Sequence, residues 1–188
     1  MFLAKESFPF TRPLEENWVT VRDELLALPE SRFLTWPERE LHEGGWEVFG
    51  LHAFGERLEA NCNACPKTAA LVEAIPLMTT AGFSVLRPGT VIKPHVGYSS
   101  DVLRCHLGLI VPSDCALEVG GEVRTWREGE CLIFDDTVRH SAWNKSTTPR
   151  VVLLIDFARP GIHPMMSVPA EVRQTVALAK REQRRTDN

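Results

Sequence analysis

Apolar residues recur along this chain with two different spacings. From residue 14 to residue 28 they repeat at intervals of three and four, which predicts an amphipathic helix that Pro29 ends. PKTAALVEAIP (residues 66–76) predicts a second helix, with Pro66 suited to its first turn. Between them, WEVFGLHAFG (residues 46–55) predicts a strand. Both helices precede a strand-rich region, so we expect them to pack outside it.

From Thr80 onward the pattern changes to short apolar runs. These runs are FSVLR, LRCHLGLIV, CALEV, EVRTW, CLIF, HSAW and RVVLLIDF. Turn residues such as Pro88-Gly89 separate them, and Gly120-Gly121 within VGGEV predicts a tight hairpin. Short strands at close intervals are typical of an antiparallel sandwich or barrel. We therefore expect a mainly β fold, a double-stranded β-helix or jelly roll, with N-terminal and C-terminal helices flanking it.

A single domain accounts for the chain, because 188 residues suffice to bury a core without disulfides or metals. We expect residues 1–80 to form a flank of helices and a strand. Residues 81–160 would form the β-helix core with the metal site. Residues 161–188 would form a tail helix that ends in a basic, polar segment.

Composition excludes several classes of protein. Hydrophobic residues make up 44% and charged residues 24%, which is ordinary for a globular protein. The net charge of -4 offers no basic surface for nucleic acid. No apolar run approaches the roughly 20 residues that span a bilayer, and the N-terminus lacks the apolar core of a signal peptide. We therefore expect a cytoplasmic protein with no nucleic-acid partner and no membrane span.

The five cysteines include one pair with metal-type spacing, Cys62 and Cys65. A structural zinc needs four ligands, and no second close pair of Cys or His accompanies them. A packed Cys65 is favoured, with a zinc or redox role as the alternative. His42 and His52 have no ligand-spaced partner either, so we expect surface or hydrogen-bonded histidines.

Two other histidines lie at loop-like ends of strand-like runs. His95 follows Pro94, and His140 lies within FDDTVRHSAW. Non-heme iron is usually held by two histidines and one carboxylate, with open positions for oxygen and co-substrate. The local pattern would be HxD followed by a distant His, but Gly97 stands at the carboxylate position. The pair is either a metal site that lacks this carboxylate or a pair of core or surface histidines.

Two arginines strengthen the metal hypothesis. Arg150 begins a strongly apolar strand, and Arg104 begins another. A guanidinium in an apolar barrel needs an anionic partner, and its fork binds a carboxylate through two hydrogen bonds. A dicarboxylic co-substrate could supply that carboxylate. The alternative is pairing with acidic residues of the chain, namely Asp135, Asp136 or Asp156.

Together these blocks resemble the aspartyl/asparaginyl β-hydroxylase family of iron(II)- and 2-oxoglutarate-dependent dioxygenases. The matching blocks are FSVLRPGTVIKPHVG, RCHLGL, RTWREGECLIFDDTVRHSAWN and RVVLLIDFARP, with CPKTAALVEAIP and Gly45-Trp46 fitting more weakly. Their order and spacing make the set specific as a multi-part motif, and the strong blocks cover about half of the chain.

The resemblance implies roles for individual residues. His95 and His140 resemble the family's two iron ligands, and Gly97 resembles the glycine that replaces the third ligand in several members, where a water could bind. Arg150 resembles the arginine that pairs with the distal carboxylate of 2-oxoglutarate. Further co-substrate residues would be Ser84, His106 and Arg104. Supporting residues around the metal would be Trp143, Asp135, Asp136 and Gly97.

The resemblance implies a reaction but not a substrate. Fe(2+), 2-oxoglutarate and O2 would hydroxylate an unactivated carbon, with succinate and carbon dioxide as co-products. The favoured target is the β-carbon of an aspartyl or asparaginyl group in a free amino acid, a peptide or a carrier-bound unit. A lipid acyl chain is the alternative within the family, ranked lower because of the absent membrane segment and Gly97. A non-redox cupin-type metal-binding protein is the alternative outside it.

Overall fold

The computed structural model describes residues 1–164 and residue 177, so the expected tail helix over residues 161–188 lies almost wholly outside the described residues. The helices are α1 Thr11–Glu16, α2 Trp18–Leu26, α3 Glu59–Ala64 and α4 Pro66–Glu73. The strands are β1 Phe2–Leu3, β2 Leu34–Thr35, β3 Trp46–Ala53, β4 Glu56–Arg57, β5 Met78–Leu86, β6 Val91–His95, β7 Val102–Ile110, β8 Cys115–Val119, β9 Glu122–Arg124, β10 Cys131–Phe134, β11 His140–Asn144 and β12 Arg150–Ala158.

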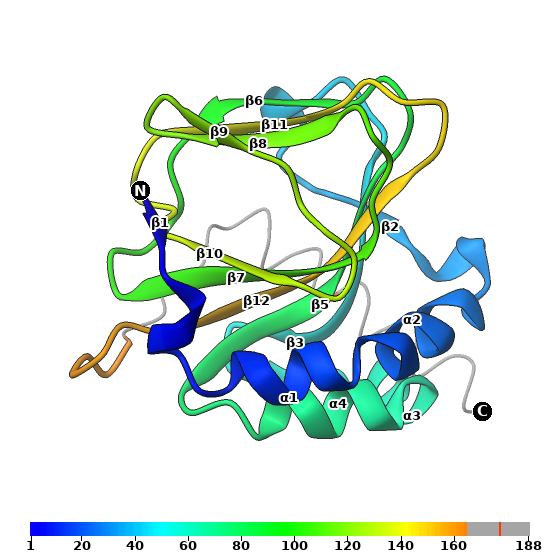
Figure 1. Cartoon of the computed structure of the whole chain (residues 1–188). Helices are drawn as coiled ribbons and strands as arrows, with labels where there is room; N and C mark the ends of the chain where they lie inside the picture. The colour runs from blue at the N-terminus through cyan, green and yellow to red at the C-terminus, as the bar shows by residue number, and fades with distance from the viewer. Residues whose placement is uncertain (165–176, 178–188) are drawn as a thin grey trace.

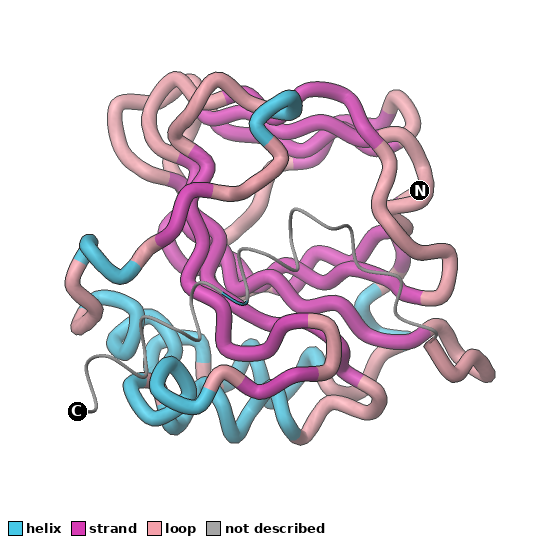
Figure 2. Tube along the Cα trace, turned by 180° about the vertical axis from the view of Figure 1, so that it is seen from behind, coloured by secondary structure: helices cyan, strands magenta, loops and turns pink. Residues whose placement is uncertain are grey.

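The strands form two antiparallel sheets that face each other. Within the described residues, the larger sheet has the order β1-β10-β7-β12-β5-β3-β2, with β4 paired to β3, and the smaller has the order β6-β11-β8-β9. Figure 1 shows the smaller sheet above the larger one, with the helices beneath the larger sheet, and Figure 2 shows the same layers from behind. The expected mainly β jelly roll with helices outside it is confirmed.

Alternation along the central strands divides the interior into two cores. Phe83 of β5 and Leu153 of β12 face the helices and pack with Leu14, Val21 and other apolar side chains. Their sequence neighbours face the smaller sheet, where a second core includes Leu86, Leu117, Trp126 and Val152. Because successive side chains of a strand point to opposite faces, each central strand is apolar on both sides, as its near-continuous hydrophobic runs require.

The helix expected over residues 14–28 is wrong in its boundaries. It begins earlier, at Thr11, and is divided into α1 and α2 at Asn17. The Asn17 backbone lies outside the helical region, with φ -109° and ψ 11°, and its side-chain amide donates to the Pro13 carbonyl at 2.8 Å. Asparagine side chains compete with helical hydrogen bonds in this way. The apolar face survives the break, since Leu14, Val21 and Leu25 are all buried.

The turn chemistry read from the sequence is confirmed at the β8–β9 hairpin. Gly120 and Gly121 both have positive φ, 59° and 86°, as the two central residues of a type I′ turn require. Val119 pairs with Glu122 across this turn. The strand expected over residues 46–55 is β3, which ends at Ala53 because Phe54 and Gly55 turn the chain with positive φ.

No helix among residues 1–164 is long and apolar enough to cross a bilayer. The N-terminal 80 residues are joined tightly to the β-rich core: β1 pairs with β10, and β3 extends the larger sheet by pairing with β5 along most of its length. Helices α2 and α4 rest against β7 and β5.

Substitution of Gly82 tests how closely β3 and β5 approach. A Cβ at Gly82 would lie 2.7 Å from the Phe49 carbonyl oxygen and 2.9 Å from the Gly50 Cα, both backbone atoms that cannot rotate away. Gly82→Ala should therefore destabilise the fold by about 1–3 kcal/mol in chemical unfolding. Gly50→Ala, directly opposite in register, is the matched control and should cost less, because its Cβ would meet the flexible tip of Leu58 at 3.1 Å. Equal losses would contradict the close backbone approach.

Candidate metal centre and adjoining cleft

His95 and His140 lie opposite each other on neighbouring strands. His95 ends β6, His140 begins β11, and the two are register partners with ring centroids 4.2 Å apart. Nδ1 of His95 bonds the Lys93 carbonyl at 2.8 Å, and Nδ1 of His140 bonds the Val138 carbonyl at 2.9 Å. A carbonyl only accepts, so each Nδ1 carries the proton and each Nε2 keeps a free lone pair. This is the arrangement that orients metal-binding histidines.

Both rings are uncharged near neutral pH. Burial, followed by the neighbouring His95, lowers the pKa of His140 to about 3. Burial also lowers the pKa of His95, against an opposing contribution from its bond to Lys93. Since a metal binds the neutral imidazole, no proton has to be displaced from either Nε2.

Gly97 and Asp136 occupy the same space beside this pair. A Cβ at Gly97 would overlap Oδ2 of Asp136 and lie 2.9 Å from its Oδ1. The Gly97 amide donates to the Asp136 carbonyl oxygen at 2.7 Å, which holds the two segments together. Asp136 is 1% exposed, its Oδ1 has no hydrogen-bond partner within the described residues, and burial raises its pKa to about 6. A carboxylate therefore lies where a side chain at position 97 would have been.

Arg150 is a buried cation that meets no carboxylate in the described part of the chain. It is 2% exposed, donates to the Ser84 carbonyl at 3.3 Å and stacks over the Trp126 ring, with 4.6 Å between Cζ and the ring centroid. Its Nε is buried without a partner. Burial lowers the pKa of Arg150 to about 9, which expresses the cost of holding this charge without an anion.

His106 contributes a second unpaired donor to the same cavity. The Trp126 indole donates to Nδ1 of His106 at 3.1 Å, so the neutral ring carries its proton on Nε2. That Nε2 is buried and has no partner among the described residues. Burial, with Arg150 nearby, lowers the pKa of His106 well below its usual value, so the ring stays neutral. Ser84 completes this end of the cavity and accepts from the Trp46 indole at 3.2 Å.

Arg104, unlike Arg150, is fully engaged by acidic residues. It donates to both oxygens of Asp156, at 2.7 and 2.9 Å, and lies 3.3 Å from Oδ2 of Asp136. Although burial opposes its charge, these two carboxylates raise the pKa of Arg104. The pairing that the sequence left open for both arginines thus holds for Arg104 alone.

The remaining supporting residues lie in different places. Asp135 accepts from Thr137 and Arg159, and these bonds lower its pKa although burial opposes them. It therefore anchors the loop before β11. Trp143 lies on the face of β11 opposite to His140 and Ala142, where the Lys145 ammonium is 5.6 Å from its ring centroid. The other predicted residues fall into two groups. Gly97 and Asp136 meet each other beside Arg104, and the remaining six line one cavity: Ser84, His95, Arg104, His106, His140 and Arg150.

A largely apolar cleft adjoins this cavity on the inner face of the larger sheet. Trp46, Ser84, Arg104 and Leu154 line both spaces and so form the boundary between them. The cleft is further lined by Leu34, Trp36, Val48, Phe54 and Tyr98. Glycines 50 and 82 form part of its floor, where larger side chains would have filled it. Sequence reasoning missed this cleft and the part played by Trp126, whose signal was one tryptophan in the polar run VRTWREGE.

The four other histidine and cysteine positions considered from the sequence are buried. His42 bonds the Trp36 carbonyl and accepts from the Gly44 amide, which confirms a hydrogen-bonded role. Cys65 is 0% exposed and packs in the core beside the helices, as expected. His52 bonds Glu73 at 3.1 Å, and Cys62 lies close to both. No sequence pattern indicates that these three residues would meet, because they come from β3, α3 and α4.

Fold and cavity together define a jelly-roll protein with a paired-histidine site. The chain belongs to the aspartyl/asparaginyl beta-hydroxylase family, whose model matches residues 15–160. It is 39% identical over 165 residues to the ornithine lipid ester-linked acyl 2-hydroxylase of Rhizobium tropici, with 82% of this chain and 59% of that protein covered. It is 36% identical over 170 residues to the human aspartyl/asparaginyl beta-hydroxylase, with 85% of this chain covered.

This chain spans only part of those relatives, 59% of the Rhizobium protein and 22% of the human one. Among solved structures, a Pseudomonas putida prolyl-4-hydroxylase matches with a TM-score of 0.50 and 15% sequence identity, covering 77% of this chain and 88% of that one. At that identity the likeness concerns the fold.

Asp136→Asn should change stability in a pH-dependent way. The pKa of this carboxyl rises from 3.8 to about 6 on folding, so its ionised form destabilises the fold increasingly above the lower value and fully above the higher one. At neutral pH the metal-free variant should therefore be more stable than the parent, on the order of 1–3 kcal/mol. The difference should shrink as pH falls through 6.

Urea unfolding in a chelating buffer at neutral and at mildly acidic pH measures this effect. Asp135→Asn is the control with the opposite sign. Its pKa is lowered on folding, so its removal should cost stability at neutral pH. A neutral-pH loss in both variants would contradict the raised pKa of Asp136.

Proposed function

We propose that this protein is an Fe(2+)- and 2-oxoglutarate-dependent dioxygenase that hydroxylates an unactivated carbon. The observation that carries the proposal is the buried Arg150, which meets no carboxylate in residues 1–164 and shares one cavity with two histidines. A buried, unpaired guanidinium is costly unless a ligand supplies the anion. A dicarboxylic acid would satisfy it while its other end reaches the metal.

The residues present fit an iron centre. His95 and His140 would be the protein ligands through their free Nε2 atoms, and Asp136, whose carboxylate fills the space beside Gly97, would be a supporting residue next to them. Two nitrogen ligands with open positions suit a redox metal that must also bind oxygen and co-substrate. When bound, iron together with 2-oxoglutarate and O2 supplies the oxidant for the C–H bond, and succinate and carbon dioxide are the co-products.

The side chains around the cavity bind and orient the co-substrate. Arg150 would form a forked pair with its distal carboxylate, assisted by the Nε2–H of His106 and the hydroxyl of Ser84. Trp126 fixes both donors, because it accepts Arg150 on its ring face and holds His106 in the tautomer that donates into the cavity. The apolar wall of Ile92, Leu117 and Phe134 excludes water from this end.

Arg104 stands between the co-substrate cavity and the cleft, and we assign it to the boundary of co-substrate and substrate. Its pairs with Asp156 and Asp136 fix the guanidinium, so that it shapes the passage between the two spaces. Asp135 and Thr137 brace the loop that delivers His140. These contacts hold Arg104 and His140 in fixed positions. The side chains would therefore orient the substrate carbon toward the metal, and they would not act as acids or bases.

The favoured substrate group is an aspartyl or asparaginyl side chain, free, peptidic or carrier-bound, which would be hydroxylated at its β-carbon. Its support is the family itself and the human relative, named as an aspartyl/asparaginyl beta-hydroxylase. Arg32 lines the cleft and, within residues 1–164, pairs with Asn61 and with no carboxylate, so it is placed to meet an acidic substrate group.

A lipid acyl chain is the second candidate, and a specific observation favours it. The cleft beside the histidines is walled largely by aliphatic and aromatic side chains, which match a hydrocarbon chain better than a carboxylate. The Rhizobium relative is named as an acyl 2-hydroxylase. An aspartyl group requires a cationic side chain in the cleft, whereas an acyl chain requires an apolar wall. Substitutions of cleft residues therefore distinguish the two candidates.

Anaerobic addition of Fe(2+) and 2-oxoglutarate tests the reaction. We expect a visible metal-to-ligand charge-transfer band, followed by succinate formation when oxygen and substrate are added. His140→Ala should abolish the band with the fold intact. Arg150→Ala should retain iron but weaken 2-oxoglutarate by roughly 10–100-fold, because one charge-assisted pair contributes about 1.5–3 kcal/mol.

Arg12→Ala is the matched arginine control, because its side chain lies on the surface in a pair with Glu16. It should leave both constants unchanged. Absence of the band and of succinate with every substrate would overturn the dioxygenase and leave a non-redox cupin-type metal-binding protein. Equal losses of iron and 2-oxoglutarate in Arg150→Ala would overturn the carboxylate assignment.

Two cleft variants distinguish the substrate candidates. Arg32→Gln should raise KM for an aspartyl peptide at least tenfold and leave an acyl substrate nearly unaffected, since only the former presents a carboxylate. Val48→Asn should do the reverse by placing an amide against the chain. Product mass, with a gain of one oxygen atom, measures both reactions over free Asp, free Asn, peptides, carrier-linked amino acids and acyl lipids. If neither substitution changed KM for any substrate, the substrate would bind outside this cleft.

A further inference from the structure

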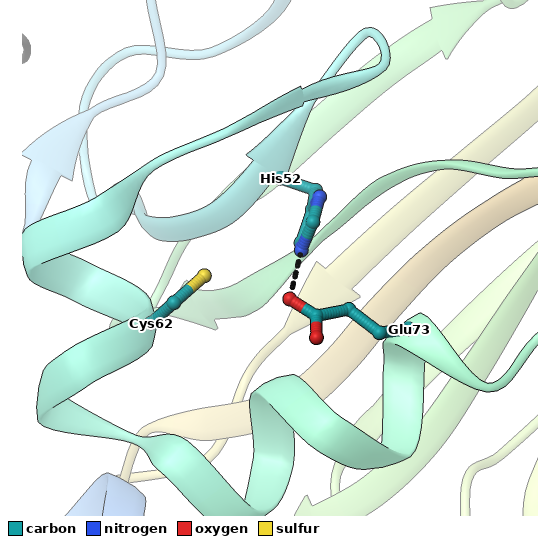
Figure 3. Close-up of side chains that lie close together, drawn as sticks. All are labelled: His52, Cys62 and Glu73. Carbon is teal, nitrogen blue, oxygen red and sulfur yellow. Dashed lines mark hydrogen bonds and ion pairs between the residues drawn. The ribbon is translucent and has the colours of Figure 1, made fainter.

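A second cluster of metal-type side chains lies apart from the paired histidines. His52 comes from β3, Cys62 from α3 and Glu73 from the end of α4, and Figure 3 shows the three side chains converging. Their imidazole, thiol and carboxylate ligand atoms all lie within 4.8 Å of one another. Three segments that are separate in sequence therefore present one nitrogen, one sulfur and one oxygen to a common point.

We propose that His52, Cys62 and Glu73 form a zinc site that clamps the wall of the apolar cleft. Zinc is bound at roughly 2.0–2.3 Å by nitrogen, sulfur and oxygen, and three protein ligands with one water complete a tetrahedron. In a tetrahedron with those bond lengths the ligand atoms lie roughly 3.3–3.8 Å apart, so ligand atoms that now lie within 4.8 Å of one another would approach by up to about 1 Å. The thiolate distinguishes this site from the two-histidine cavity and favours zinc over harder ions.

The surroundings of the cluster accommodate the ion chemically. The Cys62 thiol donates to the Leu51 carbonyl at 3.2 Å, and zinc binding would exchange this proton for the Zn–S bond and release it to solvent. The Leu51 oxygen then keeps its bond from the Leu58 amide at 2.9 Å. Oε1 of Glu73 accepts hydrogen bonds from both His52 and Arg57, and the Glu73 side chain is partly exposed.

Charge around the cluster is balanced once the ion is bound. The Cys62 thiolate and the Glu73 carboxylate neutralise the two charges of zinc. His52 binds as a neutral ring, its hydrogen bond to Glu73 being replaced by the bonds to zinc and its one proton staying on the nitrogen that does not bind the ion. Arg57, which pairs with Glu73, also forms an ion pair with Glu59. The guanidinium therefore has a carboxylate partner of its own and remains beside the site as a neutral pair.

The position of the cluster gives the ion a structural role. His52 lines the cleft, and so do Leu58 and Asn61 from the segment that leads into Cys62. A zinc ion would tie β3 to α3 and α4 and fix that wall. Cys65, the other half of the CxxC pair, lies outside the cluster among the residues described, and burial raises its pKa to about 12. The CxxC spacing thus contributes one ligand and not two.

The test uses the full chain carrying His95→Ala and His140→Ala, so that the paired histidines cannot bind the probe metal. Cobalt(II) added to this background without oxygen should give one equivalent of binding with a near-ultraviolet thiolate-to-metal band, and zinc should displace it. Adding Cys62→Ser should abolish the band. Cys65→Ser is the matched control, a buried thiol three residues away, and should retain it.

Glu73→Gln guards against a variant that fails to fold, because the Glu73 side chain is 40% exposed. We expect it to weaken cobalt and zinc at least tenfold and to remove the rise in Tm that zinc gives the background protein. No thiolate band in the background protein, or a band that survives Cys62→Ser, would overturn the site. The result is independent of dioxygenase activity, since the background lacks both histidines of the proposed iron centre.

Discussion

Pairing between β6 and β11 is the constraint on which the candidate centre depends. His140 and His95 face the same cavity only because they are register partners, and a slip of one residue would turn one ring to the opposite face. β11 is held from both sides, by β6 and by five consecutive partners in β8. The glycine hairpin after Val119 in turn fixes β8 against β9. The glycine turn therefore helps to set the distance between the two histidine rings, through β8, β11 and β6.

Two buried polar atoms without partners line the paired-histidine cavity, and a third belongs to Asp136, which pairs with Arg104 of the same cavity; the other such atom among the described residues, Nε of Arg22, lies on α2. Nε of Arg150, Nε2 of His106 and Oδ1 of Asp136 are buried without partners among the described residues. Each such group costs free energy in the protein alone, commonly about 1–3 kcal/mol. A fold tolerates this where a ligand later supplies the partners. Arg104, whose side chain is 14% exposed, pairs with two carboxylates and shows that an arginine lining the same cavity can be paired within the chain.

Much of the fold could be predicted from periodicity and turn residues. The strands after Thr80, the Gly120-Gly121 hairpin and the external helices follow from local patterns that tertiary packing reinforces. The break at Asn17 could not be predicted, because a single side-chain bond to Pro13 decides it. The two cavity histidines could be singled out, but the different environments of Arg104 and Arg150 could not. Which acid reaches which arginine depends on strand register, and Asp156 faces Arg104 across β12 and β7.

The contacts that sequence reasoning missed share one property: they join segments with no common pattern. Trp126 supports both His106 and Arg150, yet it lies outside any strand and carries no spacing signal. The meeting of His52, Cys62 and Glu73 requires the β3–β4 hairpin and two short helices to be placed together.

Gly97 makes the same point about the candidate centre. From the sequence, the absence of a side chain at Gly97 indicates a missing metal ligand. In the fold, the Asp136 carboxylate enters that space from the loop before β11. A side chain at position 97 and the present position of Asp136 exclude each other. The Asp136 carboxylate pairs with Arg104 and belongs to the loop that precedes His140. The position of this carboxylate and the position of His140 thus depend on the same segment of the chain.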